Sequence, residues 1–247
     1  MGGGSPDPLP ISEQSPGKYR VLSLAMENLY TIYGHLFRCL TEERKYTIAP
    51  TLKLTNEEFI KAIQTKKYIR IDCTSPKFDY PIVVFLLPVM SKYAKQTMAF
   101  RTLLQSVNAK KVKKAKVIVV TNPKFGVYIE RECMAQQFRH LNIENYPHRI
   151  FSVDITKGPH VAKHTIMSQN EIDELRLGPA RLEIERLPAI LVNDPQCIIK
   201  GAEVGDVVKI EGASMACGWR VDYRVVKDAN FANIRNEEKL EDTETVD

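Results

Sequence analysis

The sequence predicts an α/β domain followed by a smaller α+β domain. Apolar patterns of helix and strand type alternate through the first two thirds of the chain, Lys157-Gly158-Pro159 interrupts them, and one short helix pattern with three strand patterns follows. A chain of 247 residues suggests one or two domains with a real hydrophobic core. We therefore expect an N-terminal domain at 17–156 and a C-terminal domain at 157–227. A tail at 1–16, rich in glycine and proline and expected to be disordered, and an acidic tail at 228–247 flank them.

The larger domain is predicted from periodicity. Apolar residues at three- and four-residue spacing predict a helix from Val21 to Leu40, and the charged stretch from Thr41 to Ala49 is predicted as a turn. Thr55 and Glu58 form a capping-box pattern before a helix at 55–65. Strands are expected at 68–73, 80–87, 117–120 and 149–155, and helices at 99–107 and 129–140. This order is typical of an α/β sandwich.

The smaller domain begins with a second capping box, in which Ser168 and Glu171 start a helix that runs through Leu175. A short helical turn is expected at 181–186, and strands at 189–192, 207–210 and 220–226. The prolines at 188 and 195 fix extended or turning backbone, and the glycines at 201 and 205 permit tight turns.

Composition limits the class of protein. The content of 44% hydrophobic and 26% charged residues is ordinary for a soluble globular protein. No run of 18 apolar residues exists, so we expect no membrane-spanning helix. The N-terminus lacks the pattern of a secretory signal peptide. The five cysteines are scattered without a C-x-x-C pair, so we expect reduced, mostly buried thiols in an intracellular protein.

Charge is distributed unevenly along the chain. Seven carboxylates against Arg235 and Lys239 give the stretch 228–247 a net charge of −5, so the rest of the chain carries +10. A basic body suits a polyanion or an acidic protein surface, although a solvated charged face is the alternative.

Motifs for catalysis or metal binding are incomplete. His160 and His164 have the spacing of metal ligands on a helix, but no third ligand is evident and Pro159 favours an extended path. Asp72 and Asp79 suggest a metal-dependent nuclease, yet the strand after Tyr80 carries no Glu-x-Lys to complete the site. The chain has no Gly-x-Ser-x-Gly, phosphate-binding loop or GxGxxG. We expect no catalytic residue, metal, cofactor or small-molecule ligand.

The densest basic cluster precedes the strand that starts at Val117. It is either a patch that contacts phosphates or a helix end whose lysines complement the helix dipole. Its candidates for lying near DNA are Lys110, Lys111, Lys113 and Lys114, with Lys116 beside them.

The order of residues after His160 resembles a known family. The chain is similar, roughly over residues 20–227, to the fifth common subunit of nuclear DNA-directed RNA polymerases, whose archaeal counterpart is the H subunit. The residues that carry the likeness are His164, Leu187-Pro188, Asp194-Pro195, Gly201, Gly205, Val207 to Ile210 and Tyr223-Arg224, with Arg101 to Leu104, Lys116 to Val120 and Ile150 to Thr156 collinear upstream. The stretches Gln196 to Ile199 and Ala213 to Gly218 depart from the family pattern, which suggests a diverged lineage, a polymerase-specific paralogue or a version from a large DNA virus.

The resemblance implies a structural subunit without catalysis. The N-terminal domain would be a non-catalytic jaw with a restriction-endonuclease-like sandwich, near downstream double-stranded DNA. The C-terminal domain would be an assembly domain that docks on the largest subunit. Its docking candidates are His164, Leu187, Pro188, Asp194, Pro195, Gly205, Lys209, Tyr223 and Arg224. The expected place is the nucleus or nucleolus, or, for a viral polymerase, the cytoplasm or virion. A nuclease-like DNA-binding enzyme and an unrelated adaptor that uses the acidic tail are the alternatives.

Overall fold

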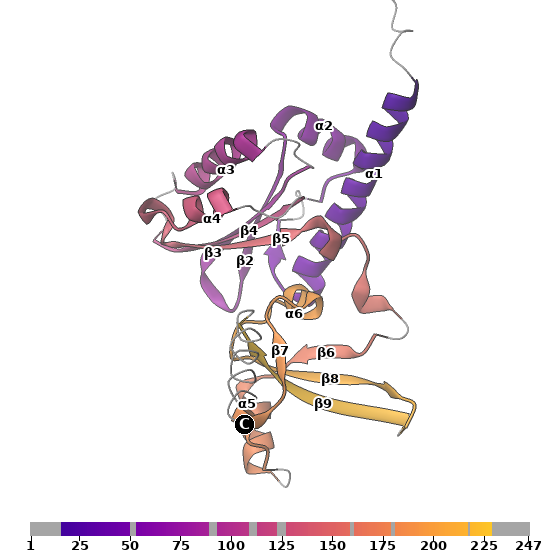
Figure 1. The fold of residues 1–247 in the computed structure, drawn as a ribbon, viewed down its shortest axis with the longest axis vertical. Helices are drawn as coiled ribbons and strands as arrows, with labels where there is room; N and C mark the ends of the chain where they lie inside the picture. Colours follow the sequence, from indigo (N-terminus) through magenta and orange to yellow (C-terminus); the bar gives the residue numbers. More distant parts are fainter. Residues whose placement is uncertain are drawn as a thin grey trace, which may run out of the picture. The chain divides into compact units, whose positions relative to one another are not determined.

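The computed structural model describes residues 16–49, 53–88, 93–108, 113–122, 127–158, 161–178, 181–216 and 218–228. The described chain divides into two compact units (Figure 1). The first comprises the described parts of the stretches up to Gly34, from Pro50 to Ile71 and from Val83 to His148. The second comprises His35–Ala49, Asp72–Ile82 and the described residues from Arg149 onward. Both units are thus built from stretches that interleave along the sequence.

The first helix is longer than its pattern predicted. Helix α1 spans Pro16–Arg38 and continues as a π-helical turn, Cys39–Glu43. The predicted turn at 41–49 is wrong in part, because a short strand, β1 (Thr47–Ile48), lies within it. Helix α2 (Asn56–Lys66) confirms its predicted capping box. The backbone N–H of Thr55 donates to the Glu58 carboxylate at 2.8 Å, and the N–H of Glu58 donates to the Thr55 hydroxyl at 3.4 Å.

Five strands form the N-terminal sheet in the order β1-β2-β3-β4-β5. The bounds are β2 Ile69–Ser75, β3 Phe78–Leu86, β4 Ala115–Thr121 and β5 Leu141–Pro147. Strand β1 is antiparallel to β2, and β4 is parallel to β5 in a register that pairs Ala115 with Leu141. The predicted strands at 68–73, 80–87 and 117–120 are confirmed within a few residues.

Two helices cover one face of this sheet within the first unit: α3 (Tyr93–Asn108) and α4 (Val127–Cys133) (Figure 1). Phe85 of β3 and Val117 of β4 pack with Phe100 and Leu104 of α3 and with Ile129 of α4. The alternate residues of the same strands are also buried, namely Ile82, Val84, Leu86, Ile118 and Val120. Burial on both faces explains why the sequences of these strands are nearly continuous apolar runs.

The end of the predicted α/β region differs from expectation. The strand predicted at 149–155 is wrong, because the last strand is β5 at 141–147 and short 3-10 turns occupy 148–150 and 155–157. Strand β5 lies at the edge of the sheet, where its outer edge is not covered by another strand. It can therefore carry the polar residues Asn142, Glu144 and Asn145, and for that reason its sequence was not recognised as a strand. The apolar Phe151, which suggested a strand, is buried in a turn instead. The helix predicted at 129–140 ends at Cys133, and a 3-10 turn follows at Gln136–Phe138.

The C-terminal sheet has four strands in the order β6-β8-β9-β7. Its elements are β6 (Lys163–Ile166), α5 (Gln169–Leu177), a 3-10 turn (Ile184–Arg186), β7 (Ala189–Leu191), α6 (Pro195–Lys200), β8 (Val207–Ser214) and β9 (Gly218–Lys227). This mixed α/β content agrees with the predicted α+β class. The sequence-based prediction did not include β6 or α6.

Both faces of the C-terminal sheet are covered near β7. On one face Val207 and Val225 pack with Ile184 and with partly buried residues of the α5 region. On the other face Val208 and Val226 pack with Ile190, Cys197 and Ala202. Strands β8 and β9 continue as a hairpin as far as the pair Ser214–Gly218, beyond the residues that β6 and β7 reach (Figure 1).

The end of α1 belongs to the same compact unit as this sheet. The Cys39 thiol donates to the carbonyl oxygen of Ile199 at 3.2 Å, and the Arg44 guanidinium donates to that of Ile198. Lys200 pairs with Glu43, and Arg38 pairs with Asp154. These bonds tie the end of α1 to α6 and to the turn that precedes the small sheet. Among the described residues no helix combines the length and apolar character that crossing a bilayer requires.

Candidate partner-docking site

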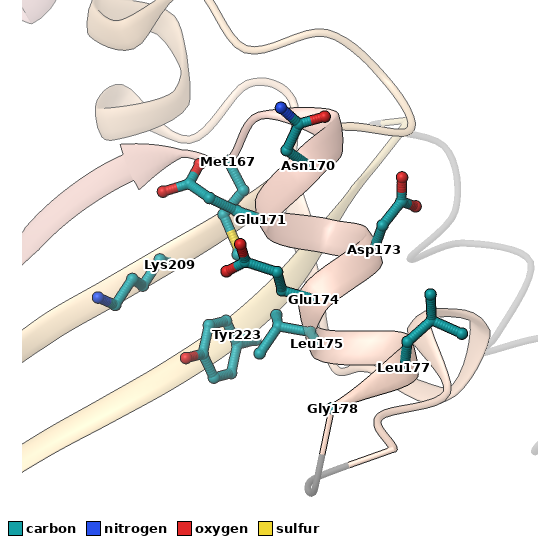
Figure 2. A pocket seen from close by; sticks show the side chains of 10 residues that line it. All are labelled: Met167, Asn170, Glu171, Asp173, Glu174, Leu175, Leu177, Gly178, Lys209 and Tyr223. Atoms are coloured by element: carbon teal, nitrogen blue, oxygen red, sulfur yellow. The ribbon is translucent and has the colours of Figure 1, made fainter.

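A surface groove of about 860 Å³ lies between α5 and the β8–β9 hairpin (Figure 2). We call it the docking groove. Its lining residues are Met167, Asn170, Glu171, Asp173, Glu174, Leu175, Leu177, Gly178, Lys209 and Tyr223. Figure 2 shows Glu171 and Glu174 projecting from α5 toward the side of the groove where Lys209 and Tyr223 stand.

Local sequence explains how each wall is positioned. Ser168 caps α5, since its hydroxyl accepts the N–H of Glu171 while the Glu171 carboxylate accepts the N–H of Ser168 at 2.7 Å. The capping box confirms the predicted helix start. On the opposite wall, Lys209 of β8 and Tyr223 of β9 are direct cross-strand partners. Side chains of such a pair leave the sheet on the same face, so both reach the groove.

Charges in the groove are unequal. Lys209 lies 2.9 Å from the Glu211 carboxylate, whose hydrogen bond raises the pKa of Lys209 and lowers that of Glu211. Hydrogen bonds from Ser168 lower the pKa of Glu171, so this carboxylate is ionised at neutral pH. No described basic side chain forms an ion pair with Glu174. Three carboxylates therefore line the groove against one lysine that is already paired.

The structure brings two of the nine docking candidates together in this groove, Lys209 and Tyr223. Gly205 lines a second hollow of about 490 Å³ and has a φ of +99°, so its part is to form a turn. His164 lies in β6, as the expected extended path requires, and its Nδ1 donates to the Ala162 carbonyl at 2.8 Å. Arg224 donates to the Ala189 carbonyl at 3.4 Å.

The remaining candidates support the scaffold. Asp194 is the N-cap of α6 and accepts the N–H of Gln196 at 2.8 Å, and Pro195 occupies the first helical turn. The Pro188 carbonyl accepts the N–H of Val225 at 3.0 Å. Leu187 is partly buried against the Val207–Val225 cluster. These contacts lie within the module, and a docking role for the four residues stays a prediction.

Sequence reasoning missed the acidic wall of the groove. Glu171 was identified only as a capping residue, and Glu174 and Leu175 were not singled out. The capping box at Ser168 predicts where the helix begins, and residues three and four positions apart lie on one face of a helix. Residues 171, 174 and 175 could therefore have been recognised as one face of this helix.

The other candidates from the sequence lie apart from this groove's lining. Lys110, Lys111 and His160 lie outside the described residues, while Lys113 and Lys114 are exposed before β4. Lys116 lies inside β4, is only 2% exposed and pairs with Glu144 at 2.8 Å. Asp72 in β2 and Asp79 in β3 are exposed. Across the described part of the chain, no three His, Cys, Asp or Glu side chains converge to hold a metal ion.

Comparisons with known proteins match the module that carries the groove. Residues 153–226 match the family model described as RNA polymerase Rpb5, C-terminal domain. The "DNA-directed RNA polymerase RPB5 homolog" of African swine fever virus (isolate Tick/Malawi/Lil 20-1/1983) is 29% identical over 210 residues, which cover 82% of this chain and 98% of the viral protein.

Archaeal proteins match a shorter stretch more closely. The "DNA-directed RNA polymerase subunit Rpo5" of Methanosarcina mazei is 47% identical over 66 residues, 27% of this chain and 83% of the archaeal protein. That of Methanosphaera stadtmanae is 37% identical over 75 residues, 30% of this chain and 96% of the archaeal protein. These matches confirm the resemblance inferred from the residues, and the chain belongs to the Rpb5 family of RNA polymerase subunits.

Proposed function

We propose that this chain is a non-catalytic subunit of a multi-subunit DNA-directed RNA polymerase, which docks on the largest subunit through the C-terminal module. The observation that carries the proposal is the extent of the family match. Residues 153–226 include every strand of the four-stranded sheet except the last residue of β9, together with α5, α6 and the docking groove. The matched unit is a complete sheet with both of its covering helices, which suits a module that docks as a whole.

The N-terminal α/β region is proposed to act as a jaw near downstream DNA. The positive charge of the chain outside the acidic tail supports this role, because basic surfaces attract phosphates at long range. Lys113 and Lys114, exposed beside β4, are the described residues that we propose to lie near DNA. Lys116 is left out, because it is buried and paired.

Two kinds of polymerase fit the chain, a nuclear one and a virus-encoded one. We favour the viral interpretation, since a protein of African swine fever virus is matched over 82% of this chain and 98% of its own length. The place of action would then be the cytoplasm or the virion, in place of the nucleus or nucleolus.

Affinity purification of the tagged full-length protein, followed by mass spectrometry, tests this function. We expect the large polymerase subunits to co-purify in amounts comparable to the tagged chain, and their sequences identify which polymerase is served. The double variant Gly205→Val with Pro188→Ala should reduce their recovery, because valine is strained at a φ of +99°. Circular dichroism of the purified variant checks that it is folded. Recovery of the tagged protein without large polymerase subunits would show that the proposal is wrong.

A paired charge change tests the jaw role. Lys113→Glu with Lys114→Glu should weaken retention of the purified polymerase on a downstream DNA duplex and lower the slope of log affinity against log salt by about 1–2. Lys61→Glu with Lys66→Glu, on the exposed surface of α2, is the matched control. Equal salt slopes for the two double variants would exclude Lys113 and Lys114 from DNA contact.

A further inference from the structure

The docking groove continues into an apolar stripe along β9. Side chains alternate between the faces of a strand, so Tyr223, Val221 and Trp219 lie on the same face. Val221 is 40% exposed and Trp219, the only tryptophan of the chain, is 63% exposed. Val221 and Trp219 pair with Glu211 and Ala213 of β8, beyond the residues of β9 that pair with β7.

An exposed row of this kind indicates a binding surface. Large apolar side chains rarely remain in water as a continuous stripe, and tryptophan and tyrosine are the residues that contribute most energy at protein interfaces. The stripe starts in the groove at Tyr223 and extends toward the hairpin end, so one partner segment has a continuous path along it.

The charges of the residues that line the groove indicate which kind of partner segment it would bind. Glu171, Asp173 and Glu174 line the groove, while the positive charge of Lys209 is already met by Glu211. Figure 2 shows Glu174 projecting toward Tyr223 and Asp173 projecting away from it. A cation that enters the groove would lie near the Glu174 carboxylate and the Tyr223 side chain, and a carboxylate and an aromatic ring both attract a guanidinium or ammonium group.

We propose that the groove and the β9 stripe bind a basic segment of a polymerase subunit, in which an arginine or lysine precedes apolar residues. The cation lies between Glu174 and Tyr223, and the apolar residues cover Val221 and Trp219. This inference rests on the proposed function, and it adds the place and the chemistry of the contact.

Site-specific photo-crosslinking in the assembled polymerase tests the contact. p-Benzoylphenylalanine replaces Val221 in the tagged chain, and the purified complex is irradiated and digested for mass spectrometry. We expect one crosslinked peptide, from one polymerase subunit, with net positive charge and apolar neighbours. The same probe at Val204, which is 57% exposed outside this surface, should not crosslink to that peptide. An acidic peptide, or identical products from both positions, would overturn the proposal.

Reversing the charge of Glu174 is a second test of the proposal. Glu174→Lys should reduce the recovery of polymerase subunits after a moderate-salt wash by about tenfold, which is the loss expected when a charge pair at an interface is broken. The recovery with Glu174→Gln should lie between that of Glu174→Lys and that of the wild type. Glu130→Lys, an equal charge change at an exposed position of α4 outside the groove lining, is the control for net charge. If the wild type recovers polymerase but Glu174→Lys and Glu130→Lys behave alike, this inference fails and the proposed function stands. If the wild type recovers none, the proposed function fails and this inference fails with it.

Discussion

The ammonium nitrogen of Lys116 lies 2.8 Å from Oε1 of Glu144, and this ion pair joins the parallel strands β4 and β5. The lysine side chain is 2% exposed and the glutamate side chain 23%. Glu144→Gln should therefore lower the free energy of unfolding by about 2–3 kcal/mol, since a buried ammonium loses its counter-charge while residual solvent moderates the cost. Urea unfolding at neutral pH measures the change.

The double variant Lys116→Met with Glu144→Gln distinguishes charge from packing at the same site. It keeps the straight apolar stem and removes both charges, so neither is left without its partner, and the stability should change by less than about 1.5 kcal/mol. If the double variant destabilises the protein as much as Glu144→Gln alone does, the unpaired charge is not the reason for the loss.

Acid stability should depend on His148. Burial lowers the pKa of His148 below its ordinary value of 6.5, against the opposing effect of backbone hydrogen bonds at Leu87 and Val120. Its Nε2 donates to the Leu87 carbonyl at 2.7 Å in the neutral ring. On acidification, His148 takes up a proton in the unfolded chain before it does so in the folded chain, where its pKa is lower. The neutral ring therefore contributes its full stabilisation above pH 6.5, and this contribution is lost as the pH falls from 6.5 through the lowered pKa.

Thermal unfolding at pH 7.5 and 5.5 measures this dependence. His148→Gln keeps a hydrogen-bond donor without a titrating ring, so the drop in melting temperature on acidification should become smaller. His164→Gln, at a half-exposed position in β6, is the control and should leave the drop unchanged. A full drop in His148→Gln would exclude this histidine as its source.

Thiol reactivity should follow burial. Burial raises the pKa of both the Cys73 and the Cys197 thiol to about 12, and it also raises that of Cys39. Thiolates are the reactive form, so these three residues should resist a disulfide reagent at pH 8 in the native protein. Cys133, which is only partly buried, should react first in a Cys217→Ser background. Mass spectrometry after timed labelling shows the order, and early modification of Cys197 would contradict the prediction.

Asp194 should matter through α6 and not through direct contact with a partner. Asp194→Ala removes the acceptor for the Gln196 N–H and should cost about 1 kcal/mol of stability, whereas Asp194→Asn keeps an oxygen acceptor and should cost less. Chemical unfolding followed by circular dichroism measures both. Loss of polymerase recovery at full stability would instead assign Asp194 a direct docking contact.

Local signals in the sequence were reliable where they act within a few residues. Thr55 and Ser168 both cap helices as their spacing with a glutamate three residues later predicts. The apolar runs of β3 and β4 reveal buried strands because both of their faces are covered. The helix α6 also had a local signal, since Asp194-Pro195 can start a helix and Gly201, with a φ of +69°, ends it. That pattern was interpreted only as turn chemistry.

Features that depend on distant residues could not be predicted in the same way. Strand β5 is polar because it lies at a sheet edge, and an edge position is a property of the whole sheet. The docking groove needs the register that sets Lys209 beside Tyr223 and the packing that brings α5 next to them. Sequence similarity identified Lys209 and Tyr223, but it did not indicate that Glu174 faces them.

The bond from Cys39 to Ile199 joins residues 160 positions apart, and this has a consequence during synthesis. The segment His35–Ala49 leaves the ribosome well before α6, with which it shares a compact unit. At about 5–20 residues per second, that segment waits on the order of ten seconds or more for its partner. The first unit can fold once His148 has emerged from the ribosome. Until α6 is synthesised, the nascent chain then has one folded unit and an end of α1 that is still exposed. We expect a chaperone that binds apolar helix ends to bind the nascent chain during this time.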